Sequence, residues 1–469
     1  MASAEVARAL RTAPNGKAPG WDGLPAELFK AFSQQFSPVL AALYTAIGTT
    51  GSMPPRFTDG IIKVLFKKGD PTQPGNYRPI TLLNTDYRIL AKVLALRLGP
   101  ALNAAIAAVQ TAFLPERLIG CNILTLRQLP HLLRRQNRSA IIAFLDFAKA
   151  YDTVHRDFLL AAMTELGASE QLRKWVHTLL AETRAQAMVG GHLSTPVSMA
   201  AGVRQGCPLA PLLYLFVAQA LLSWLQRKGI GIRLTPESDT DQLTAVQFAD
   251  DGQVLLEGES AVPTFLEAMQ TFAQAAGQRL NLDKVELLKV GVEQPQQPPQ
   301  PLAAPQPGQQ QHQPQPELAA PLVSGLRLVP GATALGIQFT NAVQLAPASG
   351  QNRALTTTKQ RLHRLSILPL SVFGRCAGVS SYALQLRTYH WEHGGLPSGT
   401  VTAEIEGWAA AVCDRQVSPQ APSQRLTGIP KKLLYGHPTA GGFGLLPLQA
   451  HVRAREAVWA ARFARLACT

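Results

Sequence analysis

Paired cysteines and a secretion signal are both missing from this chain. The cysteines are Cys121, Cys207, Cys376, Cys413 and Cys468. They include no Cys-x-x-Cys pair, and none of them stands at zinc-knuckle spacing from a histidine. This pattern argues against a structural zinc and favours a reducing compartment. The first residues, MASAEVARALRTAPNGK, contain no apolar core of the kind that a signal peptide needs. No internal repeat is present.

No uninterrupted apolar run is long enough to cross a bilayer, which takes about 20 residues in a helix. The longest run, PLAPLLYLFVAQALLSWL at residues 208–225, is broken by Pro208, Pro211, Gln219 and Ser223. We therefore expect a helix buried in a large core and no membrane partner.

Acidic residues are too few to balance the basic ones. The 469 residues include 44 Lys and Arg against 30 Asp and Glu, which gives a net charge of +14. The basic residues are spread along the chain rather than gathered in one block, so extended contact with nucleic acid is the better interpretation. A hydrophobic content of 46% is enough for a sizeable core, and the length suggests roughly three folding units.

One segment differs from the rest in composition. Residues 293–321, EQPQQPPQPLAAPQPGQQQHQPQPELAAP, are low-complexity Pro and Gln and can bury almost nothing. We expect a disordered insertion. Its closure costs little, because loop entropy rises slowly with length.

Two adjacent carboxylates stand between apolar runs in VQFADDGQVLLE, residues 246–257. The flanking Val, Phe and Leu favour strands, and Asp250, Asp251 and Gly252 favour a tight turn that tolerates positive φ. The pattern predicts a hairpin with two acids at its tip. Taken alone, the segment is better explained as a surface turn than as a divalent metal site.

Two further segments place polar groups beside apolar runs. Residues 140–145, AIIAFL, are typical of a strand buried on both faces, and Asp146 follows it, where sites collect in mixed sheets. A helix N-cap explains Asp146 equally well. Gly202 and Gly206 flank Arg204 and Gln205 before the long apolar helix. Such a start could take a phosphate or a base edge, or could be a simple cap.

Several segments, in order, resemble the reverse transcriptase region of non-LTR (LINE-type) retrotransposons. The resemblance covers nearly the whole chain apart from the Pro/Gln segment. It rests on NGKAPGWDGLPAELFKAF (15–32), FKKGDPTQPGNYRPITLLN (66–84), FLDFAKAYDTVHRDFLL (144–160), GVRQGCPLAPLLY (202–214), FADD (248–251), GQRLNLDK (277–284) and ALGIQF (334–339).

The resemblance implies an α+β right-hand polymerase with fingers, a palm with an antiparallel sheet and a helical thumb. The implied divisions are fingers and N-terminal extension at 1–139, palm core at 140–292, the disordered insertion at 293–321, a primer-grip-like end of the palm at 322–345, and helical thumb and C-terminal region at 346–469.

The resemblance also implies a two-metal site. Asp146, Asp250 and Asp251 match the palm aspartates that hold two Mg²⁺ ions, with Mn²⁺ as a substitute. Such ions lie about 3.5–4 Å apart and act on the attacking and leaving oxygens. Lys284 matches a lysine that could protonate the departing pyrophosphate, although a structural role is equally open.

Other residues match the family's dNTP site. Arg78, with Lys67 or Lys68, would neutralise the triphosphate, although a solvated charge explains one of the lysines. Phe147 belongs to the same site. Tyr151 would pack under the sugar and exclude a 2′-hydroxyl, or be a core aromatic. Gln205 and Gly206 would line the nascent base pair, and residues 335–337 resemble the primer-gripping hairpin.

The implied function is RNA-directed DNA synthesis with an RNA template, a DNA primer and dNTPs, inside the cell and, by family, in the nucleus. Ala210 and Val285 depart from the family pattern, away from the metal site. An endonuclease-like domain and a Cys/His cluster are absent, so we expect a fragment; its oligomeric state is open. The alternative is an inactive, nucleic-acid-binding remnant, although the intact acids favour an enzyme. A third interpretation is a group II intron maturase or an RNA-dependent RNA polymerase. Tyr151 argues against the use of rNTPs, and we see no added maturase-type domain.

Overall fold

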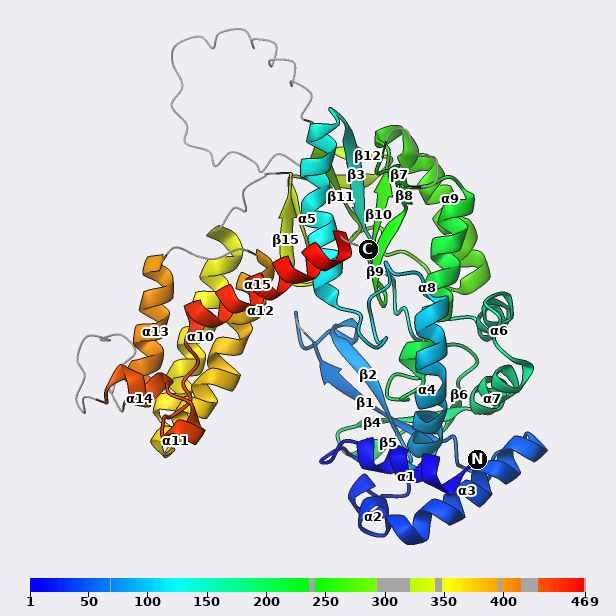
Figure 1. The fold of residues 1–469 in the computed structure, drawn as a ribbon. Helices are drawn as coiled ribbons and strands as arrows, with labels where there is room; N and C mark the ends of the chain where they lie inside the picture. The colour runs from blue at the N-terminus through cyan, green and yellow to red at the C-terminus, as the bar shows by residue number, and fades with distance from the viewer. Residues whose placement is uncertain are drawn as a thin grey trace. The chain divides into compact units, whose positions relative to one another are not determined.

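The computed structural model describes residues 1–67, 69–235, 241–292, 321–341, 348–394, 399–414 and 429–467 (Figure 1). The chain forms two compact units, one made of 1–125 and 132–329, the other of 126–131 and 330–469. Each unit has its own core of buried apolar side chains. Lys68 and all but the last residue of the expected insertion lie outside the described residues.

Helices surround the sheets of the first unit. Their bounds are α1 (Ser3–Thr12), α2 (Ala26–Ala31), α3 (Ser33–Thr50), α4 (Thr85–Ala105), α5 (Ile119–Arg135), α6 (Arg156–Glu165), α7 (Glu170–Ala181), α8 (Ala210–Arg227) and α9 (Val262–Ala276). Within α5, residues 126–131 belong to the second unit. The longest apolar run of the sequence forms α8, and most of its side chains are buried, as expected. In the described part of the chain, no helix is both long and apolar enough to span a membrane.

Local sequence explains where several helices begin and end. The Ser169 hydroxyl accepts a hydrogen bond from the Leu172 amide at 3.3 Å and caps α7. Gly51 and Gly277 follow α3 and α9 with φ of 69° and 76°. This left-handed conformation ends a helix at no steric cost only for glycine.

A six-stranded sheet carries the acidic segments. Its order is β12-β13-β11-β3-β10-β9, with bounds β3 (Ser139–Phe144), β9 (Ala245–Phe248), β10 (Asp251–Leu256), β11 (Glu286–Gly291), β12 (Leu322–Val323) and β13 (Leu326–Val329). Strand β3 is buried from Ala140 onward, as its apolar run predicts. It pairs antiparallel with both β10 and β11.

The expected antiparallel sheet also contains one parallel pair. Strands β11 and β13 run parallel, with Glu286 opposite Arg327. A parallel pair cannot be joined by a tight hairpin and needs a connection of a dozen or more residues. Residues 293–320 lie between the two strands and supply that length.

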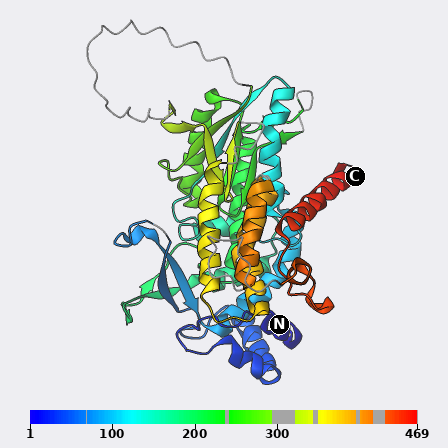
Figure 2. The same cartoon turned by 90° about the vertical axis from the view of Figure 1, so that its left-hand side faces the viewer.

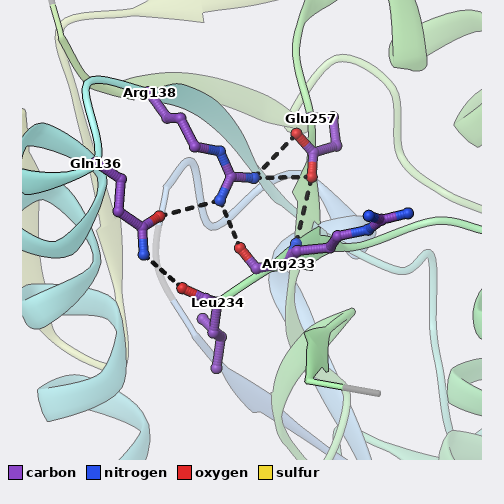
Figure 3. Close-up of polar contacts among 5 residues, drawn as sticks. All are labelled: Gln136, Arg138, Arg233, Leu234 and Glu257. Carbon is purple, nitrogen blue, oxygen red and sulfur yellow. Dashed lines mark hydrogen bonds and ion pairs between the residues drawn. The ribbon is translucent and has the colours of Figure 1, made fainter. Parts of the chain in front are cut away.

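A polar cluster fastens the sheet at the ends of β3 and β10 away from the acids (Figure 3). The Arg138 guanidinium, just before β3, donates to Glu257 just after β10, at 3.0 and 3.2 Å. It also donates to the Gln136 side chain and the Arg233 carbonyl. Gln136 in turn donates to the Leu234 carbonyl at 2.6 Å. This end of the sheet is therefore held by side chains as well as by the strand ladder.

A second sheet and a short ribbon complete the first unit. The sheet has the order β2-β1-β4-β5, with β6 also on β4; the bounds are β1 (Gly60–Phe66), β2 (Tyr77–Leu83), β4 (Arg184–Val189), β5 (His192–Leu193) and β6 (Val197–Ser198). Strands β4 and β5 form a hairpin whose turn contains Gly190 and Gly191. The ribbon pairs β7 (Ile232–Arg233) with β8 (Gln242–Leu243).

The second unit is mainly helical. It contains the hairpin β14 (Gly331–Ala334)–β15 (Ile337–Thr340) and the helices α10 (Ala348–Ser366), α11 (Val372–Gly378), α12 (Gln385–Gly394), α13 (Gly399–Cys413), α14 (Lys431–Tyr435) and α15 (Leu448–Ala467), with a π-helical turn at Val379–Leu384. Helices α10 and α13 lie side by side (Figure 2).

The segment 322–345, expected to form one end-of-palm element, is divided between the two units. Strands β12 and β13 extend the six-stranded sheet, whereas β14 and β15 pair with each other. The turn expected at residues 335–337 exists, with positive φ at Leu335 and Gly336. The Tyr389 hydroxyl of α12 donates to the Leu335 carbonyl at 2.6 Å, which ties this turn to the helices of its own unit.

Candidate active site

The register of β3 and β10 brings the predicted acids to one edge of the sheet. Gln253 lies opposite Phe144, and the Leu145 amide donates to the Gly252 carbonyl at 2.8 Å. Continued by one step, the same antiparallel register sets Asp251 opposite Asp146. Asp250 occupies the turn between β9 and β10. Acids that are about a hundred residues apart in sequence thus become neighbours.

The turn itself differs from the expected Asp-Asp-Gly turn. Phe248 pairs with Asp251, so Ala249 and Asp250 form the turn and Gly252 lies within β10. The residue with positive φ is Ala249, at 57°, and not Gly252. The turn is displaced by a long-range contact, because the hydrogen bond from the Leu145 amide holds Gly252 within the strand ladder.

Burial and like charge act together on the hairpin acids. Burial raises the pKa of Asp250, and the charge of Asp146 raises it further, while Lys67 and Arg78 lower it. Burial also raises the pKa of Asp251, with the charges of Asp250 and Asp146 next in importance. The three carboxylates therefore interact, and a positive charge between them would be strongly favoured.

The donor set suits a hard divalent cation. Mg²⁺ prefers oxygen ligands and usually takes only one or two carboxylates, with waters and phosphates completing its shell. In the described parts of the chain, no three His, Cys, Asp or Glu side chains form a ready-made metal cage. The Lys284 ammonium lies 3.3 Å from Asp146 Oδ2. Three interacting carboxylates without nitrogen or sulfur ligands fit Mg²⁺ or Mn²⁺ completed by substrate oxygens.

Tyr151 lies beside these acids. Its ring stacks on Tyr214 of α8 with centroids 4.7 Å apart and planes at 21°. Burial raises the pKa of the Tyr151 phenol, and the charges of Asp250 and Asp251 raise it further. Tyr214 is buried, and the half-buried Tyr151 ring lies over it next to the hairpin. Phe147 follows Asp146 and is bridged to Leu280 through its backbone.

Gln205 and Gly206 pack against β2. The Thr81 amide donates to the Gln205 carbonyl at 2.8 Å. Gly206 has φ of 115°, and a Cβ there would lie 2.3 Å from the Thr81 carbonyl oxygen. Because α8 begins at Ala210, Gly206 lies before the helix, and close packing against Thr81 explains why this residue is a glycine.

The two described cations of the expected triphosphate site come from β1 and β2. Arg78 lies on β2 opposite Leu65 of β1. The Lys67 amide donates to the Asn76 carbonyl at 2.8 Å just beyond the pair. Both side chains are exposed, and both lower the pKa of Asp250. The positive charges are therefore electrostatically linked to the acids and available to solvent.

The structure adds residues that sequence reasoning did not single out. Asp152 accepts from Gln205 Nε2 at 3.3 and 3.4 Å, and burial raises its pKa. Gln278 accepts from the Tyr214 hydroxyl at 3.0 Å and donates to the Ala150 carbonyl at 2.8 Å. Both lie inside the quoted motifs, one residue after Tyr151 and one residue after Gly277. Their position next to Tyr151 and Gly277 was the signal that could have identified these two residues. Their hydrogen-bond partners are distant in sequence, so the contacts themselves could not be predicted.

Comparison with known proteins identifies the family. Residues 66–314 match the family described as reverse transcriptase (RNA-dependent DNA polymerase). The transposon TX1 149 kDa protein of Xenopus laevis is 31% identical over 280 residues, which cover 60% of this chain and 21% of that protein.

Two further relatives carry informative names. The retrovirus-related Pol polyprotein from the type-1 retrotransposable element R2 of Popillia japonica is 30% identical, over 50% of this chain and 32% of that protein. The RNA-directed DNA polymerase from the mobile element jockey of Drosophila melanogaster is 28% identical, over 60% of this chain and 31% of that protein.

This chain thus spans about a fifth to a third of the length of these relatives. The expected α+β fold of a right-hand polymerase is confirmed. Because the match to the family covers more than half of the sequence, the chain belongs to the reverse transcriptase family, and its relatives place it with the LINE-type enzymes of non-LTR retrotransposons.

Proposed function

We propose that this chain is an RNA-directed DNA polymerase that adds dNTPs to a primer 3′-hydroxyl on an RNA template. The observation that carries the proposal is the end of the six-stranded sheet to which the β3–β10 register brings Asp146, just after β3, and Asp250 and Asp251, at the start of β10. The charge of Asp146 raises the pKa of both hairpin acids, which supports a shared cation site. The template, the primer and a nuclear location come to this chain through its family.

The three carboxylates would hold two Mg²⁺ ions, or Mn²⁺ in their place. When bound, such ions activate the attacking oxygen and stabilise the leaving one. Lys67 and Arg78 would neutralise the triphosphate from the β1–β2 side, since the charge of each lowers the pKa of Asp250. Tyr151, fixed by its stack on Tyr214, would lie under the sugar.

Two other side chains would act around the reacting atoms. Gln205, held by Asp152, would line the nascent base pair. Gly206 would keep that segment close to β2, where a side chain would collide with Thr81. Lys284 would give a proton to the departing pyrophosphate after leaving its ion pair with Asp146.

The test is primer extension on an RNA template with dNTPs and Mg²⁺, comparing wild type with Asp250→Ala. We expect a loss of at least about a hundredfold, because the variant removes a group that stabilises charge in the transition state. Asp157→Ala, an exposed acid on α6, is the matched control and should extend normally. Equal primer extension by wild type and Asp250→Ala would contradict the assignment of Asp250 to the active site. No extension by a wild-type protein that still binds RNA would favour the inactive remnant.

A further inference from the structure

The turn that carries Asp250 depends on an alanine in an unfavourable conformation. Ala249 has φ of 57°, in the left-handed region where the Cβ of an L-residue crowds its own carbonyl. Neither glycine nor asparagine, the usual residues there, is used. Some other interaction must therefore hold the turn in place.

A buried glutamine from a distant segment makes that interaction. The Ala249 amide donates to Gln110 Oε1 at 2.9 Å, and Gln110 Nε2 donates to the Ala249 carbonyl at 3.3 Å. Gln110 is 0% exposed. Its side-chain amide thus pairs with both backbone groups of the strained residue, as a neighbouring strand would.

The backbone around Gln110 also follows β9. The Gln247 amide donates to the Val109 carbonyl at 2.9 Å, and the Thr111 amide donates to the Gln247 carbonyl at 3.0 Å. The Asn122 side chain adds a hydrogen bond of 2.7 Å to the same Gln247 carbonyl. The segment 109–111 therefore covers the outer edge of β9. Its register with β9 fixes the position of Gln110 beside the turn.

Arg117 fixes the same segment from its other side. Its Nη1 donates to the carbonyls of Ala107 and Gln110 at 2.6 and 2.7 Å. Its Nη2 donates to the carbonyls of Asn103 and Ile106 at 2.6 and 2.7 Å, and its Nε to Asn103 Oδ1 at 2.8 Å. All five donors of the guanidinium are used, in a planar geometry that lysine cannot reproduce.

We propose that Gln110, braced by Arg117, is a positioning residue that sets the geometry of the Asp250–Asp251 hairpin for cation binding. This inference rests on the proposed function. Gln110 touches no substrate; it acts by holding Ala249 in the left-handed region, which aims the next residue, Asp250, toward Asp146. Without Gln110, the turn would relax and the cation would lose part of its ligand set.

The test combines amide hydrogen exchange of the hairpin with the binding of Mn²⁺ to the full chain. In Gln110→Met, which keeps length but removes both hydrogen bonds, we expect faster exchange at residues 249–251. We also expect a Mn²⁺ dissociation constant raised about 10–100-fold, as for other residues that orient metal ligands. RNA binding should not change. Arg117→Lys should shift both readouts in the same direction by a smaller factor.

A rescue separates positioning from general support of the fold. Glycine adopts positive φ without strain, so Ala249→Gly in the Gln110→Met background should recover much of the lost Mn²⁺ affinity. If Gln110 only fills the core, or only accepts the Ala112 amide at 3.1 Å, this second change would recover nothing. The matched control is Gln136→Met, which removes the hydrogen bond from the Gln136 side-chain amide to the Leu234 carbonyl at the other end of the same sheet (Figure 3). It should leave Mn²⁺ affinity unchanged.

The proposal is overturned if Gln110→Met and Arg117→Lys both bind Mn²⁺ as wild type does, or if Gln136→Met weakens binding equally. If Gln110→Met fails to fold, Gln110→Glu replaces it: it keeps an acceptor for the Ala249 amide and should give an intermediate loss. A wild-type chain that makes no DNA would defeat the proposed function only, because exchange and Mn²⁺ affinity do not require synthesis.

Discussion

Asp250 and Asp251 have raised pKa values because burial, and then neighbouring carboxylates, oppose their ionisation. A group whose pKa is higher in the folded chain stabilises the fold fully below its unfolded pKa. That contribution is lost as pH rises through the folded pKa. At neutral pH without a cation, ionised acids at this site therefore weaken the fold. Sites that bind cations commonly accept such a cost.

Asp250→Asn should accordingly raise Tm by a few degrees at pH 7 without divalent metal, while abolishing DNA synthesis. The gain should shrink as pH falls toward the ordinary aspartate value of 3.8, because the wild-type acid then becomes neutral too. Calorimetry at several pH values in chelator measures this. Asp157→Asn should show no such gain, and a lower Tm for Asp250→Asn would contradict the assigned electrostatics.

Tyr151→Ala should allow rNTP incorporation, because the ring stacked on Tyr214 would no longer block a 2′-hydroxyl. The ratio of kcat/KM for rNTP to that for dNTP measures the effect and is insensitive to loss of stability. We expect this ratio to rise at least about tenfold, which corresponds to about 1.4 kcal/mol. Tyr151→Phe keeps the ring and should keep the selectivity; an unchanged ratio in Tyr151→Ala would remove the sugar-gate role.

At the level of elements, the loop before α8 packs against β2 through one glycine. Gly206 combines φ of 115° with a Cβ position 2.3 Å from the Thr81 oxygen. Arg204, two residues earlier, is buried and donates to the Thr58 and Arg184 carbonyls. The second sheet, which carries Lys67 and Arg78, is therefore positioned by the same loop that carries Gln205.

Gly206→Ala should lower the free energy of unfolding by roughly 2–4 kcal/mol, since a backbone atom must move and the residue is strained. Chemical denaturation measures this loss. Gly190→Ala is the matched control, because Gly190 also has positive φ but meets nothing within 4 Å; it should cost about 1 kcal/mol. Equal losses would show that space at Thr81 does not matter.

At the scale of the whole molecule, the parallel pairing of β11 with β13 is joined through residues 293–320. Replacing them with a Gly/Ser linker of about half the length still leaves enough chain for the connection. Stability should then change by only about 0.6 kcal/mol, because loop entropy depends on the logarithm of length. Denaturation of the shortened chain measures this. A loss of several kcal/mol would contradict this prediction.

The net charge of +14 predicts that RNA binding falls steeply with salt. Each neutralised phosphate of a single strand contributes about −0.7 to the slope of log affinity against log salt. We expect a tenfold or greater loss of affinity between about 50 and 200 mM KCl, measured with a short labelled RNA. A peptide nucleic acid of the same sequence carries no phosphate and should bind weakly at both concentrations. A slope near zero for RNA would contradict a phosphate-tracking surface.

Elements that depend on local pattern could be predicted from the sequence alone. Its continuous apolar run at 140–145 became the buried strand β3, and the interrupted run at 208–225 became the buried helix α8. The motif order predicted the family, because several short matches in sequence cannot arise by chance as easily as one. Asp146, Asp250 and Asp251 could be named for the same reason.

How these elements pack together depends on contacts between segments that are far apart in the sequence. The opposition of Asp146 and Asp251 follows from the β3–β10 register, and the parallel β11–β13 pair from strands that local pattern cannot order. Ala249, and not Gly252, has the positive φ. The hydrogen bond from Leu145 and the hydrogen bond to the Gln110 side-chain amide outweigh the intrinsic preference of glycine for positive φ. Those partners are separated by more than a hundred residues, and their energies appear only when the core has closed around them.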